Sequence, residues 1–293
     1  MDAILPSSGT SDVLASGLIR PPSGVCVLMS TYASETADNL RTSLESLYSQ
    51  TIVPERIVLV IDGAIDHDQE TVLSAFSSDP RGPKLTLVRL PQNGGLAAAM
   101  NAGLAYCDCP YVMRMDSDDV CLPDRLEHEL RYMNENPDID LVSCWSEEFG
   151  EEIPKSQYKV SPTQHDALRQ ALCWRNVIAH SAILVRTETL RKIGGYRADF
   201  GLLEDYDLYV RMMTAGAKFH VIPKVMLRVR TSLSQKQRRG NFRYALKEIK
   251  FRLNCLRLGF IKTHQFILIT TLYTAFRIVT PGLRQRLYAL SRI

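Results

Sequence analysis

Short apolar runs alternate with helical segments in the first half of the chain, and this alternation constrains the fold most. The runs occupy 24–32, 56–62, 84–90 and 111–116. The segment 37–50 has leucines at helical spacing, and an Ala-rich segment follows the glycine pair after the third run. Strands that alternate with helices form a mostly parallel sheet covered by helices on both faces. The sequence therefore predicts an α/β fold.

The second half continues this pattern less regularly. Further strands are expected at 139–144 and 181–185, and a helix is expected to start at Pro123, since proline suits the first helical position. A later helix should open at Glu204 and stop at Gly216.

Composition divides the chain into three parts. Residues 1–23 are rich in Ser, Gly and Pro and read as a loose arm without the pattern of a signal peptide. Residues 24–235 form the main domain, and 236–293 form a basic, amphipathic helical extension. From Asn241 to Ile293 there are ten Lys and Arg residues and one acid, a net charge of +9, so the rest carries −6 of the total of +3. The basic extension predicts an anionic surface as its partner.

The extension contains one apolar stretch, 264–279. Only eleven residues separate His264-Gln265 from Arg277, whereas a bilayer span needs about 20 apolar residues. The stretch is therefore not expected to cross a membrane. Two alternatives stay open: a helix lying in the headgroup region of a membrane, or a helical hairpin that packs on the main domain or on a second subunit of a homo-oligomer.

Carboxylates follow two of the expected strands. Asp62 ends the second run, and Asp116, Asp118 and Asp119 crowd together after the fourth. Ligands of parallel α/β sheets bind beyond the carboxyl ends of the strands. Clustered carboxylates repel one another unless a cation lies among them. The alternative is a polar turn in which Asp119 caps the following helix.

Two further positions stand out. Arg114 lies inside a strand that is otherwise apolar, and an unpaired buried guanidinium would be costly, so it should meet a phosphate or one of the acids. Glu204 and Asp205 stand in the first turn of a helix. Acids are favoured there by the helix dipole alone, so a capping role is their alternative.

These acids suit two chemistries. A phosphatase of the haloacid-dehalogenase type would use the first Asp of "DSDDV" as nucleophile, but that class carries it on its first strand, and here three strands precede it. Glycosyl transfer from a nucleotide sugar needs a base pocket, a divalent cation for the leaving diphosphate and a carboxylate for the acceptor hydroxyl. All three have candidates in the expected order. A nucleotide-sugar-binding protein without turnover is a third class, which the intact set of acids disfavours.

The chain resembles a family 2 glycosyltransferase with the GT-A fold. The resemblance spans roughly 25–223. The tail that follows, "LRVRTSLSQKQRRGNFRYALKE", is also similar to bacterial transferases of exopolysaccharide, capsule and O-antigen synthesis, some of them galactosyltransferases. The matching stretches are "VLMSTY", "VLVIDG", "NGGLAAAMNAGL", "RMDSDDVCLPDRL", "AHSAILVR", "IGGYR" and "EDYDLYVRMMTAGAKFHVIP".

The resemblance implies a set of residues that bind the nucleotide-sugar donor. Thr31 and Tyr32 would lie beside the nucleobase, and Asp62 would accept a hydrogen bond from the uracil imide. Asn93, Gly94 and Asn101 would line the diphosphate. For Asn93 a helix cap is the alternative.

For the metal, the resemblance implies Mn²⁺ or Mg²⁺. Asp118 would be the direct ligand, and Asp116 would contact the cation, the ribose or a water. Hard oxygen ligands suit these ions. Many relatives carry a His where this chain has Arg230. That departure leaves the third protein ligand undefined, and Arg230 would contact phosphate instead.

For the acceptor, the resemblance implies Asp205 as general base and Glu204 as the residue that holds the acceptor or orients the base. His180 would lie near the acceptor, or would be a core histidine.

The sequence thus predicts an inverting, metal-dependent glycosyltransferase that uses a nucleotide-diphosphate sugar, with UDP expected. The expected acceptor is a polyprenyl-diphosphate-linked saccharide of bacterial surface polysaccharide synthesis. The enzyme should be cytoplasmic and peripheral on the cytoplasmic face of the inner membrane. No nucleic-acid partner is expected, and the sugar and linkage are not encoded in any motif.

Overall fold

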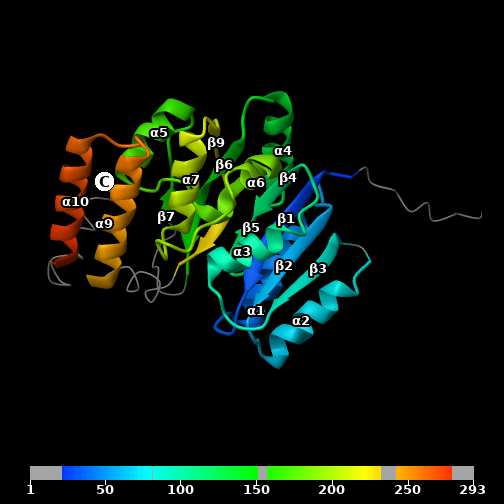
Figure 1. Ribbon diagram of the computed structural model, residues 1–293. Coiled ribbons are helices and arrows are strands. Elements are labelled where there is room, and N and C mark those ends of the chain that lie inside the picture. The colour runs from blue at the N-terminus through cyan, green and yellow to red at the C-terminus, as the bar shows by residue number, and fades with distance from the viewer. Residues whose placement is uncertain (1–21, 81, 151–156, 232–241, 279–293) are drawn as a thin grey trace, which may run out of the picture.

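The protein has the predicted α/β fold, with a β-sheet at its centre (Figure 1). The computed structural model describes residues 22–80, 82–150, 157–231 and 242–278. Most of the predicted arm 1–23 therefore lies outside the described residues. The strands are β1 (Val25–Thr31), β2 (Arg56–Asp62), β3 (Lys84–Leu90), β4 (Tyr111–Arg114), β5 (Val120–Cys121), β6 (Leu141–Phe149), β7 (Gln157–Lys159), β8 (Ile183–Arg186) and β9 (Phe219–Arg230). The helices are α1 (Ala37–Tyr48), α2 (His67–Ser77), α3 (Leu96–Leu104), α4 (Arg125–Glu135), α5 (His165–Trp174), α6 (Thr187–Lys192), α7 (Glu204–Thr214), α9 (Phe242–Arg257) and α10 (Thr263–Ile278).

The sheet is mostly parallel. Its order is β3-β2-β1-β4-β8-β6-β9-β5, with β7 paired to β6. The first four strands in this order are parallel to one another. β8 runs antiparallel to both β4 and β6, which returns β6 and its parallel neighbour β9 to the direction of β1. β5 and β7 also run the opposite way, each as the antiparallel partner of its neighbour.

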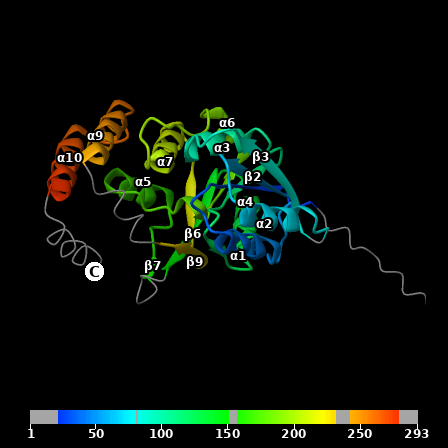
Figure 2. The same ribbon diagram turned by 90° about the horizontal axis from the view of Figure 1, so that it is seen from below.

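Helices cover both faces of the sheet, and each face has its own apolar core (Figure 2). β1 shows why, because successive side chains of a strand point to opposite faces. Cys26 and Leu28 pack with α3, α5, α7 and α9, whereas Val25, Val27 and Met29 pack with α1, α2 and α4. All five side chains are 0% exposed. Burial on both faces explains the continuous apolar run that the sequence shows here.

The helix expected from Pro123 starts later, and Asp119 does not cap it. The short strand β5 intervenes, and α4 begins at Arg125 with Asp124 as its N-cap residue. Asp119 is 1% exposed, and its carboxylate accepts hydrogen bonds from the Ser181 hydroxyl and from the Arg230 amide. A buried carboxylate needs such donors. Through them Asp119 connects the turn after β4 to Ser181 and to Arg230, which are distant in sequence.

The later helix α7 agrees with its prediction. It opens at Glu204 and ends at Thr214. Gly216 follows with a φ of 92°, the left-handed conformation in which glycine commonly ends a helix.

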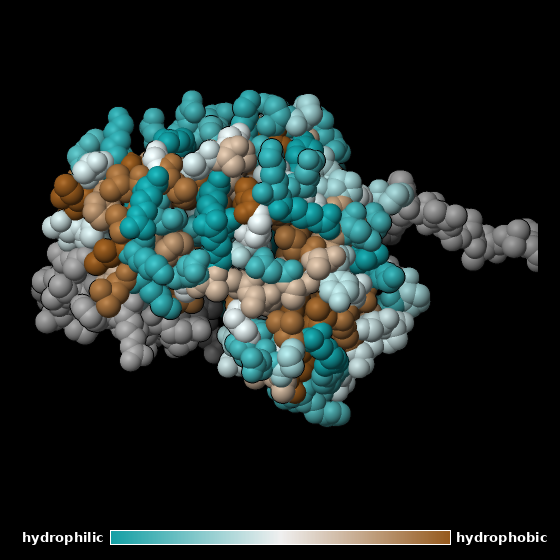
Figure 3. All heavy atoms as spheres, viewed as in Figure 1, coloured by the Kyte–Doolittle hydropathy of each residue, from teal (hydrophilic) through white to brown (hydrophobic). Residues whose placement is uncertain are grey.

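The described part of the C-terminal extension, 242–278, forms a helical hairpin that packs on the main domain, one of the two arrangements left open by the sequence. Tyr244, Phe251 and Cys255 of α9 are buried in the same core as α5 and α7. α10 contributes Ile269, which is 1% exposed, and contacts α9. The outer side of this hairpin keeps apolar surface, seen as brown spheres at the left of Figure 3. In the described part of the chain, no helix combines the length and the apolar content required to cross a bilayer.

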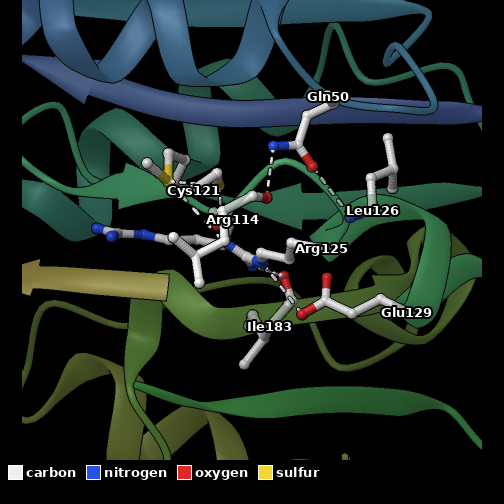
Figure 4. A network of polar contacts seen from close by, with 9 residues as sticks. Gln50, Arg114, Cys121, Arg125, Leu126, Glu129 and Ile183 are labelled. Atoms are coloured by element: carbon white, nitrogen blue, oxygen red, sulfur yellow. Dashed lines mark hydrogen bonds and ion pairs between the residues drawn. The ribbon is translucent and has the colours of Figure 1, made fainter. Parts of the chain in front are cut away.

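A buried arginine joins α4 to the two central strands (Figure 4). Arg125 is 0% exposed, and its Nε donates to Glu129 Oε1 at 3.0 Å. Its Nη2 donates to the carbonyl oxygens of Arg114 in β4, at 3.4 Å, and Ile183 in β8, at 3.5 Å. Gln50 completes the network, because its amide bonds the Leu122 carbonyl and the Leu126 amide.

Replacing Arg125 by Met should lower the free energy of unfolding by about 3 kcal/mol, because Glu129 would be left buried without its cation. Burial already raises the pKa of Glu129 to about 7, so protonation of this carboxyl should keep the loss near the lower end of the usual range. Urea unfolding at pH 8 measures the change.

The double variant Arg125→Met/Glu129→Leu removes both charges and should regain much of the lost stability. The exposed Arg131 of the same helix provides the control, and Arg131→Met should change stability little. Similar losses for Arg125→Met and Arg131→Met would contradict the importance of the buried pair.

Candidate functional site

The acid cluster forms a tight turn directly after β4. The Asp119 amide donates to the Asp116 carbonyl at 3.4 Å, and 117–118 lie in the turn. Carboxylate oxygens of Asp116, Asp118 and Asp119 all lie within 4.8 Å of one another. The carboxylates converge because the chain turns.

Arg114 anchors this turn from below. It is 1% exposed and forms an ion pair with Asp116, as the sequence predicted for one of the acids. Burial opposes the charge on Arg114, but Asp116 and Asp119 favour it, and the net effect raises the pKa of the guanidinium. Arg114 is therefore a fixed positive charge beneath the acids.

The remaining acids of the turn resist ionisation. Burial, followed by the charges of Asp116 and Asp119, raises the pKa of Asp118 to about 8. Burial and Asp116 raise the pKa of Asp119 to about 7. A divalent cation would relieve this repulsion, and the ligand atoms are hard oxygens, which fits Mg²⁺ or Mn²⁺. Both Asp119 oxygens already accept hydrogen bonds, so Asp118 and the Asp116 oxygen that does not meet Arg114 are the oxygens best placed to hold the ion.

Arg230 lies beside this turn. Its Nε donates to the Asp118 carbonyl at 3.1 Å, and its guanidinium lies 4.6 Å from the ring centre of Phe149. β9 ends at Arg230, so this strand brings a cation to the turn where the resemblance suggested a metal-binding His.

The ends of β1 and β2 place the expected nucleobase residues next to each other. Thr31 is buried, and Tyr32 is 36% exposed. Gln69 of α2 holds both, since its Nε2 donates to Thr31 Oγ1 at 3.2 Å and to the Tyr32 carbonyl at 3.1 Å. Gln69 was not predicted as a site residue. Its one signal in the sequence is a capping position, because it completes the capping box of α2 with Asp66.

Asp62 binds the loop before α3. Its two carboxylate oxygens accept from the amides of Gly94, at 2.7 Å, and Gly95, at 3.0 Å. The Asn93 side chain donates to the Asp62 carbonyl at 3.3 Å, and Gly95 is the N-cap residue of α3, so Asn93 does not cap that helix. Gly63 permits this approach, because its φ is +86° and a Cβ there would lie 2.9 Å from the Asn93 nitrogen.

Asn101 is exposed, and its side chain holds the loop at Tyr196. Its Nδ2 donates to the Tyr196 carbonyl at 2.9 Å, and its Oδ1 accepts from the Tyr196 amide at 2.8 Å. α3 thereby fixes the position of Tyr196.

Glu204 and Asp205 open α7. Glu204 is 8% exposed, and Asp205 is half-buried. Asp205 Oδ2 accepts from the Asn176 side chain at 2.7 Å, and Oδ1 accepts from the Tyr206 amide at 2.7 Å. Asn176 therefore orients the Asp205 carboxylate. The sequence offered no signal for Asn176, which lies in an irregular connection.

Tyr196 is buried close enough to both groups of acids for their charges to act on it. Burial raises its pKa, and the charges of Arg114, Asp205, Asp116 and Glu204 all act on it. The β4 turn and the start of α7 thus face one centre.

His180 and Tyr209 lie at the same centre. His180 Nε2 lies 3.0 Å from the Tyr196 hydroxyl. Burial, with the nearby Arg114 charge, lowers the pKa of His180 well below 6.5, so the ring is neutral. The Tyr209 hydroxyl is buried and has no hydrogen-bond partner within the described ranges. A polar group in that position can accept a water or a ligand group.

Comparison with known proteins shows similarity over most of the chain. The family profile described as "Glycosyl transferase family 2" matches residues 26–194, which is more than half of the chain. The chain is 32% identical over 249 residues to the amylovoran biosynthesis glycosyltransferase AmsE of Erwinia amylovora, covering 84% of this chain and 92% of that protein. It is 30% identical over 264 residues to an Escherichia coli UDP-Gal:alpha-D-GlcNAc-diphosphoundecaprenol beta-1,3-galactosyltransferase, covering 89% and 94%.

Solved structures share the fold. Staphylococcus aureus TarS 1–349 in complex with UDP-GlcNAc superposes with a TM-score of 0.63 at 17% identity, covering 84% of this chain and 70% of that one. The mannosyltransferase PcManGT from Pyrobaculum calidifontis, in complex with GDP-Man and Mn²⁺, gives 0.62 at 19%, covering 86% and 70%. The sheet is that of the GT-A fold, and the chain belongs to glycosyltransferase family 2.

Proposed function

We propose that this protein transfers a sugar from a nucleotide-diphosphate sugar, with UDP the expected nucleotide, to a membrane-borne saccharide acceptor, with inversion at the anomeric carbon. The observation that carries the proposal is the pair of acid groups around Tyr196. One, at the β4 turn, suits a cation and a diphosphate. The other, at the start of α7, suits proton transfer from an acceptor hydroxyl. Family membership weighs against the phosphatase alternative, as does the position of Asp116 after the fourth strand along the chain.

The donor would lie across the carboxyl ends of β1, β2 and β4. Thr31, Tyr32 and Asp62 would contact the nucleobase. Asp62 would also hold the loop before α3 in place, through its hydrogen bond from the Gly94 amide. When bound, the divalent cation would neutralise charge on the leaving diphosphate. Arg114 and Arg230 supply fixed positive charge on two sides of the same turn.

Asp205 would remove the proton of the acceptor hydroxyl. Asn176 holds one carboxylate oxygen and the Tyr206 amide the other, so the carboxylate is oriented before the acceptor arrives. The deprotonated oxygen would attack the anomeric carbon directly as the bond to the diphosphate breaks. Glu204 would bind the acceptor, and neutral His180 would position Tyr196 beside it. No covalent enzyme intermediate is required.

The acceptor is proposed to be a saccharide on a polyprenyl diphosphate, in bacterial surface polysaccharide synthesis. The support comes from the names of two relatives, one an amylovoran biosynthesis enzyme and the other a galactosyltransferase whose acceptor is a diphosphoundecaprenol derivative. Such an acceptor is confined to a membrane, so a cytoplasmic location with peripheral contact through the C-terminal extension follows from the same proposal.

Replacing Asp118 by Asn should reduce turnover by at least about 100-fold, because a bound cation contributes several kcal/mol to the transition state. UDP binding should also lose its dependence on Mn²⁺, measured by calorimetry with and without the ion. Asp68→Asn, at an exposed acid of α2, is the control and should change neither property. Retention of Mn²⁺-dependent activity in Asp118→Asn would show that the acids are only a polar turn.

Stability should depend on pH through Asp118. Its pKa is raised to about 8, so between about pH 4 and pH 8 the folded state binds more protons at this site than the unfolded state, and stability falls as pH rises. Without metal, Asp118→Asn should therefore gain stability relative to the wild type between pH 4 and pH 8 in thermal unfolding. Mn²⁺ at pH 8 should stabilise the wild type only. A difference that does not change with pH would refute the raised pKa.

Replacing Asp205 by Asn keeps the shape of the side chain but removes its ability to accept a proton. We expect kcat to fall by at least about 100-fold, while nucleotide-sugar affinity changes little. Asp166→Asn is a matched control, since Asp166 is an exposed acid in the first turn of α5. An equal loss of donor affinity would move Asp205 into the donor pocket, and normal turnover would reduce it to a helix cap.

A further inference from the structure

A pocket lies between α5 and the start of α10. None of its lining residues belongs to the proposed donor or acceptor site. The volume of the pocket is about 340 Å³. Two cations belong to its wall, Arg169 of α5 and Lys262 just before α10, and the described lining residues include no carboxylate. The lining residues are Arg169, Gln170, Cys173, Trp174, Gly259, Phe260, Lys262 and Gln265.

The two cations are presented differently. The Arg169 guanidinium lies 4.9 Å from the ring centre of Phe260 and donates to the Phe260 carbonyl at 3.5 Å, so it is held in place. Lys262 is exposed, and its backbone amide donates to Gln265 Oε1 at 2.8 Å. The positive end of the α10 dipole lies at the same position. These features together favour an anionic group in the pocket.

Apolar side chains continue from the rim of this pocket along α10. Gln265, Leu268 and Leu272 are spaced three and four residues apart, so they form one stripe on the helix. Leu268 is 48% exposed and Leu272 is 56% exposed. Trp174, which lines the pocket, is 43% exposed, and its carbonyl accepts from Tyr273 Oη at 3.3 Å and Arg252 Nη2 at 3.0 Å. Exposed tryptophan and leucine beside cations are typical of surfaces that enter the headgroup region.

The same hairpin contacts the helix that carries the proposed base. Arg252 of α9 donates to the Tyr206 hydroxyl at 3.1 Å, and the Phe251 ring centre lies 4.7 Å from that of Tyr206. Tyr206 follows Asp205 directly. Figures 1 and 2 both show α9 between α10 and α7. A membrane at α10 would therefore lie on the α7 side of the sheet.

We propose that this surface, formed by the pocket of Arg169, Lys262 and Trp174 and the α10 stripe that contains Leu268 and Leu272, docks on an anionic phospholipid membrane. The pocket takes the phosphate of a lipid headgroup, and the apolar stripe enters the boundary between headgroups and acyl chains. The positive charge of the C-terminal extension complements such a membrane. The inference rests on the proposed function in taking the acceptor to be membrane-borne, and it specifies which surface faces the lipid.

Trp174 provides a direct test. The chain has two tryptophans, so full-length Trp145→Phe leaves Trp174 as the single fluorescent reporter. With vesicles of phosphatidylglycerol at low salt, we expect its emission to shift to the blue and to be quenched by acyl chains labelled with bromine. Vesicles of phosphatidylcholine should give neither change. Binding to phosphatidylglycerol without a response from Trp174 would place the contact elsewhere and overturn the proposal.

Point variants test the pocket and the stripe separately, in full-length protein because α9 belongs to the core. Lys262→Gln and the double variant Leu268→Gln/Leu272→Gln should each weaken vesicle binding by about tenfold. Ile267→Gln is the matched control: Ile267 is 59% exposed on the same helix but lies off the stripe. Equal loss in the control would overturn the assigned face. Competition by millimolar inorganic phosphate that displaces the protein from vesicles completely would identify a soluble-anion site instead.

Sugar transfer to a water-soluble acceptor separates this inference from the proposed function. The stripe variants should keep that activity while losing transfer to a lipid-borne acceptor. If the wild type binds vesicles through Trp174 but transfers no sugar from any nucleotide sugar, the proposed function fails and the docking surface stands.

Discussion

The buried charge of Arg114 is the interaction on which the candidate site depends. A guanidinium cannot lose its proton in a protein, so a buried arginine requires carboxylates close by. Asp116 meets this requirement directly, and Asp119 contributes through its charge. The need to compensate one strand cation therefore brings acids to the end of β4, where they also repel one another. The raised pKa values of Asp118 and Asp119 follow from this crowding and from burial.

A second buried arginine supports the first. Arg125 binds the carbonyl oxygens of Arg114 and Ile183, the ends of β4 and β8 that meet at the acid turn. Ser181, just before β8, donates to Asp119. The turn is thus held from the helix beneath it and from the neighbouring strand, which suits a site whose carboxylates must keep their positions despite repulsion.

The C-terminal hairpin belongs to the catalytic unit in its packing. α9 buries Phe251 and Cys255 in the core shared with α7, and Arg252 contacts the residue after the proposed base. The boundary predicted near residue 235 from composition therefore marks a change in charge. It does not mark a separate core, because α9 shares the core of the main domain. The hairpin packs through one side and leaves an apolar stripe on the other, so the two arrangements that the sequence left open are compatible within one structure.

Local sequence patterns determined much of this protein. The β-branched runs predicted strands β1, β2, β3 and β4 closely, because strands buried on both faces require continuous apolar residues. The acids after β2 and β4, and the pair that opens α7, were likewise visible, since a strand or helix ends where its pattern ends.

Only the tertiary structure decided what each acid does. Capping of a nearby helix was the alternative role for Asp119, but its carboxylate binds Ser181 and Arg230, which are 62 and 111 residues away in sequence. Asn176 lies in no recognised pattern and Tyr196 belongs to the "IGGYR" stretch without a predicted role, yet Asn176 orients Asp205 and Tyr196 lies near both acid groups. The physical reason is that the spacing of apolar residues and the composition indicate only which side chains of a single helix or strand are buried. A carboxylate's role depends on which donors and charges other elements bring to it, and that is set only when the sheet and its helices pack.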